Sequence, residues 1–437
     1  MPDSPGNRAI TAGNSYSTWM GLIYVFNLIV GTGALTLPAV FARAGWALGL
    51  PLICILAINS YMTMTFVIEA MASANAIVQW KRLQQMEREM QLESHDEEST
   101  EDTPLFSSDS MERSSAQTHR YYVIEEKIEM GQMASIFFNR TGRLFFNSCL
   151  VIYLYGDLTI YAAAVSKSLM DVSCANNNSS NFTTPDTDVC WEKTSLTRID
   201  AYRLFLWSIH TVGSFAFFDV QKTKYLQMLT TILRQLAFAI MIITAVADLI
   251  VDGPQGQPQL ADVTGIPELF GACIYSFMCH HSLPAVVSPI SDKSRLFRSL
   301  ALDYLLIAMF YLLLALTGIF AFKHVSDLYT LDFSQRWQGQ DAFIVPRYFL
   351  ALFPVFTLST NFIIVSVTLA VVPPVSIAMA TKDLEILVGI TGSYAGTGIQ
   401  YLIPAFLVFN ARKRTSQVIG MGIKNDFESP FKAKGWV

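Results

Sequence analysis

The sequence has few charged residues and no basic block. Only 15% of its 437 residues are Asp, Glu, Lys or Arg, and the net charge is −5, so the composition gives no support to a nucleic-acid partner. Instead, 52% of the residues are hydrophobic, and many of them form apolar runs long enough to cross a lipid bilayer. We therefore expect an integral, multi-pass membrane protein.

The sequence also lacks the motifs of common enzyme classes. It contains no nucleophile motif, P-loop or dinucleotide fingerprint. The adjacent His280 and His281 would point about 100° apart on a helix, and no Cys/His pair elsewhere has the spacing of metal ligands. We expect no metal site, no organic cofactor and no enzymatic activity.

We also expect no cleaved signal peptide, because the first eighteen residues are polar and lead directly into an apolar stretch. That stretch is interrupted halfway: NLIVGTGALTLP, from Asn27 to Pro38, contains Gly31, Thr32 and Gly33 in succession. A spanning helix tolerates free backbone groups only where it faces protein or a water-filled cavity. The interruption therefore indicates a binding site.

Apolar runs predict membrane segments separated mostly by short loops. We expect a cytoplasmic tail (1–18), two helices (19–73), an acidic and largely disordered cytoplasmic loop (74–143, with 87–120 a disordered linker), the remaining helices (144–411) and a cytoplasmic tail (412–437). The apolar segments are Met20–Phe41, Trp46–Met71, Leu144–Ser166, Tyr202–Phe218, Tyr225–Ile250, Ile266–Pro289, Leu300–Phe322, a long tract Phe343–Thr381, and Leu384–Phe409.

Lys and Arg residues in the short loops predict the orientation. Basic residues lie at 222–224, 293–298 and 412–414, whereas the loop 251–268 has none. Alternating crossings from a cytoplasmic N-terminus place the basic loops inside and 251–268 outside.

The loop 167–199 falls on the outer or lumenal side by the same alternation. Glycosylation sequons begin at Asn177, Asn178 and Asn181, although such sequons also arise by chance in Asn- and Ser-rich loops. Cys174 and Cys190 flank them, and the other four cysteines lie in membrane segments, so we expect a Cys174–Cys190 disulfide.

Several stretches resemble a known family. NLIVGTGALTLPAVFARAGW, from Asn27 to Trp46, is similar to the first-helix signature of the amino acid/auxin permease family. EMGQMASIFFN, VIYLYGDLTIYAAAV, FFDVQKTKYLQ, CIYSFMCHHSLP and LVGITGSYAGTGIQYLIPAFLV resemble one orphan branch of it. The resemblance implies an all-α, multi-span, inverted-repeat amino-acid-transporter fold whose first and sixth helices are broken, but no particular substrate.

The resemblance also implies a substrate pocket. The sixth segment, GACIYSFMCHHSLP from Gly271 to Pro284, has an interrupted apolar pattern. By resemblance, the backbone of Gly31, Thr32 and Gly33 holds a substrate carboxylate, while the side chains of Tyr275, Ser276 and Phe277 line the same pocket. The alternative is that the glycines only permit close helix packing.

The coupling ion is sodium or a proton. In related permeases sodium is held by backbone carbonyls, an amide and a hydroxyl, and the nearest matches here are Asn27 and Thr360, with Thr357, Ser359 and Asn361 as rivals. These hydroxyls could equally bond to their own helix.

Asp157, near the middle of the third segment, is the candidate for proton coupling; otherwise it is a structural acid bonded by Tyr153 or Tyr161. The remaining charged residues of the membrane segments lie nearer their ends, where we expect them to anchor or snorkel: Glu69, Arg234, Asp248 and Asp303.

The chain departs from the family in one region. The tract 343–381 is too long for one crossing and too short for two with a connecting loop. The family has a charged linker and the start of another helix between the residues that match Leu369 and Val372, and a further span at its end. We expect both to be missing here.

The sequence therefore predicts a secondary active transporter that moves an amino acid or similar small zwitterion by alternating access. The alternative is a sensor or scaffold with the same fold. Tyr121–Ile124 and Glu101–Phe106 approximate signals for sorting adaptors, and they slightly favour an endolysosomal membrane over the plasma membrane.

Overall fold

The protein is a helical bundle built from the apolar segments of the sequence. The computed structural model describes residues 15–96, 121–174, 187–191, 195–215, 224–337, 340–365, 372–420 and 423–432. Within these ranges five helices are long and apolar enough to cross a membrane, and a bent pair, α1 (Thr18–Ile29) with α2 (Thr32–Ala44), adds a sixth. This confirms the predicted all-α, multi-span class.

The order of the remaining helices follows the predicted segments. It is α3 (Trp46–Asp96), α5 (Met130–Phe137), α6 (Arg140–Ser173), α7 (Arg198–Phe215), α8 (Lys224–Val251), α9 (Ile266–Ser276), α10 (Leu283–Val287), α11 (Leu296–Ala321), α12 (Thr330–Arg336), α13 (Ile344–Val365), α14 (Val372–Ala380), α15 (Leu384–Thr391) and α16 (Ile403–Val418), with two π-helical turns, Gly392–Gly396 and Gly398–Leu402, between α15 and α16.

The first membrane helix is broken where the sequence predicts it. Ser17 caps α1, whose regular bonding ends at Val30, and α2 begins at Thr32 after a bend of 51°. Since glycine has no Cβ, Gly33 can lie directly against Ser276 at the end of α9. The sixth membrane segment is also discontinuous, because α9 ends at Ser276 and α10 starts at Leu283.

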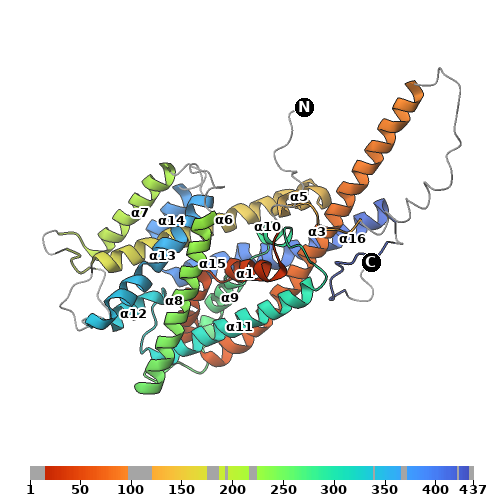
Figure 1. Ribbon diagram of the computed structural model, residues 1–437. Coiled ribbons are helices and arrows are strands. Elements are labelled where there is room, and N and C mark those ends of the chain that lie inside the picture. The colour runs from red at the N-terminus through yellow and green to blue at the C-terminus, as the bar shows by residue number, and fades with distance from the viewer. Residues whose placement is uncertain are drawn as a thin grey trace.

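Two sets of loops mark the two ends of the bundle. At one end Ala47 N donates to Leu260 O, and Leu384 N donates to Asp327. At the other, Tyr16 pairs with Ile290, and Tyr61 contacts both the Phe297 carbonyl and the Phe431 ring. The second end, which we predict to be cytoplasmic, carries Lys293 and Arg295 after α10 and the basic residues 412–414 within α16; it lies on the right of Figure 1, beside α5.

The segment that we predicted to be largely disordered is more ordered than expected. Helix α3 continues to Asp96 and projects beyond the bundle, so residues 87–96 are helical, while 97–120 lie outside the described residues (Figure 1). Residues 121–139 fold back over the lower half of this extension. Arg82 pairs with Glu126, Asn75 bonds to the Glu126 backbone, and Trp80 packs against Tyr121. These contacts join residues far apart in the sequence and bury part of the segment. The local composition alone does not predict this burial.

The long apolar tract 343–381 forms two helices, α13 and α14, and the residues that join them, 366–371, lie outside the described ranges. Helix α14 has only nine residues, whereas a helix needs about 20 to cross the bilayer. Within the described ranges the tract therefore forms two helices, of which α14 is shorter than a crossing.

Candidate functional site

The two helix breaks meet inside the bundle and are joined by side-chain hydrogen bonds. The Thr32 hydroxyl lies 3.1 Å from the Tyr275 hydroxyl. A methyl group at position 33 would stand 2.7 Å from the Ser276 Cα, which shows how closely α2 and α9 approach. The structure thus brings the predicted pocket residues of both breaks to one place.

The carbonyl groups freed by the first break are bonded by side chains of other helices. Arg234 of α8 donates from Nη1 to Asn27 O at 2.5 Å and to Val30 O at 2.9 Å. Tyr311 of α11 donates its hydroxyl to Ile29 O at 3.0 Å. A broken helix inside a membrane needs such donors because no bulk water reaches its free backbone groups.

Tyr311 also connects the two breaks, because its hydroxyl lies 2.9 Å from Ser276 O. Sequence reasoning missed Tyr311, which nothing in its apolar surroundings distinguishes. It also misplaced Arg234: rather than anchoring at a span end, this residue reaches the first break. The sequence feature that could have identified Arg234 is its position well inside the apolar tract 225–250, since intramembrane charges mark functional positions.

The three side chains predicted to line the pocket have different surroundings. Tyr275 bonds to Thr32, as described above. The Ser276 hydroxyl bonds to Ala272 O in its own helix. Phe277 is buried and packs against the rings of Tyr304 and Tyr311. Two of the three, Tyr275 and Ser276, place a polar atom beside the break in the first helix, since a Cβ at Gly33 would stand 2.5 Å from Ser276 Oγ.

Asp157 lies at the end of this hydrogen-bonded chain. It is 7% exposed, it accepts a hydrogen bond from the Tyr275 hydroxyl, and Tyr161 bonds to the same carboxylate. Tyr153, one turn earlier on α6, instead packs against the rings of Tyr275 and His281. A buried acid is thereby linked through one tyrosine to Thr32 of the first break.

The predicted sodium site lies only partly within the described residues. The Asn27 amide oxygen accepts a hydrogen bond from Gln235 at 3.2 Å. Thr360 belongs to α13, but its side chain lies outside the described residues, as do those of Ser359 and Asn361. Thr357 bonds to Phe353 O in its own helix, which is the alternative considered above.

The other charged residues have varied partners. Glu69 is buried and accepts two bonds from Arg412 and one from the Ser429 backbone, while Asp248 pairs with Arg336. Asp303 is buried, and its Oδ2 is unbonded. Within the described ranges no group of three His, Cys, Asp or Glu side chains has metal-binding geometry; His280 instead contacts Thr63.

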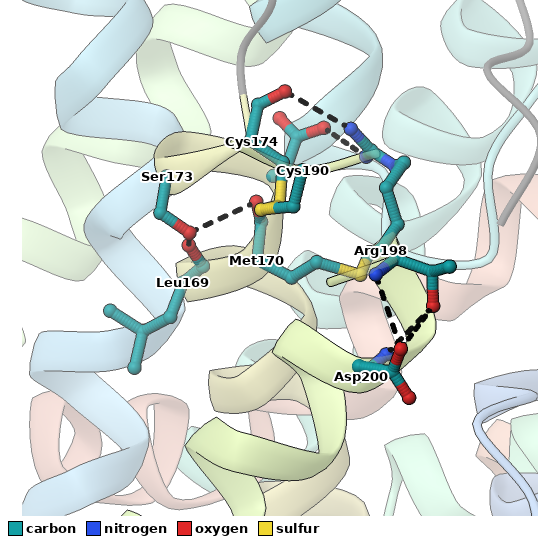
Figure 2. Close-up of a disulfide and its surroundings, with 9 residues drawn as sticks. Leu169, Met170, Ser173, Cys174, Cys190, Arg198 and Asp200 are labelled. Atoms are coloured by element: carbon teal, nitrogen blue, oxygen red, sulfur yellow. Dashed lines mark hydrogen bonds and ion pairs between the residues drawn. A yellow bond between two sulfur atoms is a disulfide. The ribbon is translucent and has the colours of Figure 1, made fainter. Parts of the chain in front are cut away.

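The predicted disulfide joins Cys174 at the end of α6 to Cys190, with a Cα–Cα separation of 4.6 Å (Figure 2). Arg198 at the start of α7 donates to Cys174 O and pairs with Asp171. The sequons at Asn177, Asn178 and Asn181 lie outside the described residues.

The fold is that of a multi-span membrane protein with paired broken helices, and sequence comparison gives the family. The profile described as transmembrane amino acid transporter protein matches residues 14–84 and 115–357. The chain belongs to this family.

Within the family, the chain is similar to the proteins named transmembrane protein 104, the orphan branch indicated by the sequence. It is 46% identical to the homologue from Drosophila melanogaster (98% of this chain, 94% of the relative) and 46% identical to that from Homo sapiens (97% and 93%). It is 32% identical to the homologue from Dictyostelium discoideum (97% and 93%). The names of these relatives state no substrate.

The comparison also bears on the missing segment. The Drosophila alignment extends over 489 residues, more than the 437 of this chain, so that relative has internal residues that this chain lacks. The predicted position of the gap, after Leu369, and the missing last span stay predictions.

Proposed function

We propose that the protein is a secondary active transporter of amino acids or similar small zwitterions, working by alternating access. The observation that carries the proposal is the junction of the two breaks: Thr32 and Gly33 of one meet Tyr275 and Ser276 of the other within a bundle of apolar helices. Transporters with broken helices bind substrate where such breaks meet.

The start of α2 suits a carboxylate. Gly31 precedes the helix and supplies no side-chain cap, so the first N–H groups of α2 have no capping side chain. A helix N-terminus attracts negative charge through these N–H groups and its dipole. In this proposal the substrate carboxylate bonds to the backbone at Thr32 and Gly33, as the resemblance implies.

For coupling we favour a proton on Asp157 over a sodium ion. Asp157 is bonded to Tyr275, which is bonded to Thr32, so protonation of the acid changes the hydrogen bonding at the proposed carboxylate site. Sodium coupling through Asn27 and Thr360 is the second candidate. Its support is weaker because the Asn27 amide oxygen is already bonded to Gln235.

Uptake into proteoliposomes tests the proposal. A panel of labelled amino acids is offered with and without an inward proton gradient, using this chain and a second version that carries the internal residues of its relatives after Leu369. We expect the proton gradient to drive uptake by the wild-type protein. Asp157→Asn should lose this dependence on the gradient but still exchange internal for external substrate. Uptake of no amino acid by either version would reject the transporter.

A sensor or scaffold with this fold is the alternative, supported by the extension of α3 beyond the bundle. Isothermal calorimetry on the same two versions separates the possibilities. Binding of an amino acid without flux favours the sensor, whereas binding with flux favours the transporter.

For location we propose an endolysosomal membrane, with the plasma membrane as the alternative. In the described structure, however, Tyr121 is 7% exposed and Ile124 is 1% exposed. An adaptor would have to unfold this segment to reach both side chains. The acidic signal 101–106, outside the described residues, is the better candidate, and deleting it should move a tagged protein to the cell surface.

A further inference from the structure

We infer that Arg234 serves as a permanently attached cation at the break in the first helix and replaces a sodium ion there. The inference rests on the proposed function and goes further, since it assigns a positioning role to a residue of α8 and predicts transport that does not require sodium.

The first step concerns the acceptor groups. The break frees the carbonyls of Asn27 and Val30, which lie three residues apart at the end of α1. Carbonyl oxygens with no helical partner attract a hard cation or strong hydrogen-bond donors. At this point of the chain, both carbonyls accept from the same atom, Arg234 Nη1, at 2.5 and 2.9 Å.

The second step concerns charge. Among the described residues, no carboxylate forms an ion pair with Arg234, so the partners of its guanidinium are the carbonyl dipoles of the break. An arginine stays protonated at every physiological pH. A sodium ion at the same two oxygens would meet a fixed positive charge at hydrogen-bond distance, which makes its binding unfavourable.

The third step concerns geometry. Gln235, the next residue of α8, bonds to the Asn27 side chain at 3.2 Å, so α8 holds both the backbone and the side chain of that residue. Tyr161, which bonds to Asp157, also lies beside Arg234. Arg234 therefore fixes the end of α1, while the Asp157–Tyr275–Thr32 chain contacts the start of α2.

The test compares three variants in proteoliposomes with external sodium or with choline. The wild-type protein should take up substrate equally in both. Arg234→Gln should lose at least about tenfold in choline, because it removes a charged donor from two carbonyls, and sodium should restore part of the uptake. Arg234→Lys, which keeps the charge, should remain independent of sodium. Arg298→Gln, which removes an exposed arginine of α11, should match the wild type.

A second readout separates this inference from the proposed function. In detergent, sodium chloride should raise the unfolding temperature of Arg234→Gln more than choline chloride does, and should not do so for the wild type, whether or not the protein transports. A sodium requirement of the wild type or of Arg234→Lys overturns the inference. So does normal uptake of Arg234→Gln in choline. If no amino acid is transported, the transporter proposal fails, and the sodium-specific stabilisation alone decides the role of Arg234.

Discussion

Gly33 and Ser276 touch across the two helix breaks, with so little space that a methyl group at position 33 would lie 2.7 Å from the Ser276 Cα. The contact involves backbone, which cannot rotate away as a flexible side chain could. It therefore sets how closely α2 and α9 can approach.

Replacing Gly33 with alanine should push α2 away from α9 and impair substrate uptake. Overpacking of this kind costs about 1–3 kcal/mol, and the displacement falls on the proposed carboxylate site. Uptake and thermal unfolding of Gly33→Ala measure the two effects. Gly131→Ala is the matched control, because its new methyl group would meet only Phe146 at 3.8 Å. Normal uptake by Gly33→Ala would remove the carboxylate assignment.

Arg43 should restrain the end of the bundle that we predict to face outward. It lies at the end of α2 and pairs with Glu268 of α9 and, at 3.2 Å, with Glu385 of α15. Half-exposed ion pairs of this kind stabilise the closed arrangement by up to about 1 kcal/mol. Losing the pair should therefore raise the equilibrium constant for opening by up to about fivefold.

This prediction can be measured at Cys273, a buried free cysteine of α9. With the other free cysteines replaced by alanine, Arg43→Gln should speed the reaction of Cys273 with a membrane-impermeant maleimide added outside. Lys323→Gln, which removes an exposed cation from the loop after α11, provides the comparison. Equal rates in both variants would show that the ion pairs do not limit opening.

Much of this architecture could be predicted from sequence, and the limits have physical causes. The apolar runs define the crossings, and Gly31 to Gly33 mark the first break, because both signals are local. Arg234 and Tyr311 act on Asn27, Val30 and Ile29, more than 200 residues away in sequence. Their roles depend on helix packing, which no local pattern encodes.

The same reason explains the error in the acidic segment. Residues 87–96 have a polar composition that alone favours disorder, yet they continue a helix that is anchored lower down by Arg82, Glu126 and Trp80. Conversely, the disulfide between Cys174 and Cys190 could be predicted. The predicted orientation places their loop outside, and the other four cysteines lie in predicted membrane segments.

Asp332 should make the stability of the protein depend on pH. Burial raises the pKa of this α12 carboxyl to about 7, and Asp327 adds to the effect, although Ser326 and Lys167 oppose it. The unfolded chain releases this proton near its ordinary pKa of 3.8, so the free energy of unfolding should fall as pH rises from about 4 to 7 and then level off.

Thermal unfolding in detergent between pH 5 and 8 measures this. The unfolding temperature of the wild type should fall by a few degrees across the range, and that of Asp332→Asn should fall less, because an amide cannot ionise. Parallel curves for the two proteins would assign the pH dependence to other groups.

The disulfide should hold the end of α6 near the start of α7. Its cysteines are 16 residues apart, and closing a loop of that size contributes about 3 kcal/mol. Cys174→Ser with Cys190→Ser should therefore unfold at a lower temperature than the oxidised wild type and at the same temperature as the reduced one. Maleimide labelling of either wild-type cysteine without prior reduction would contradict the bond.

The pairing of Tyr16 with Ile290 has a consequence for how the inner side opens. Tyr16 N donates to Pro289 O, and Ser291 N donates to Tyr16 O, so the segment that precedes α1 is hydrogen-bonded to the segment that follows α10. The helix before the first break, α1, and the helix after the second, α10, are thereby joined to each other. In the proposed transport cycle, opening of the predicted cytoplasmic side would therefore displace α1 and α10 together.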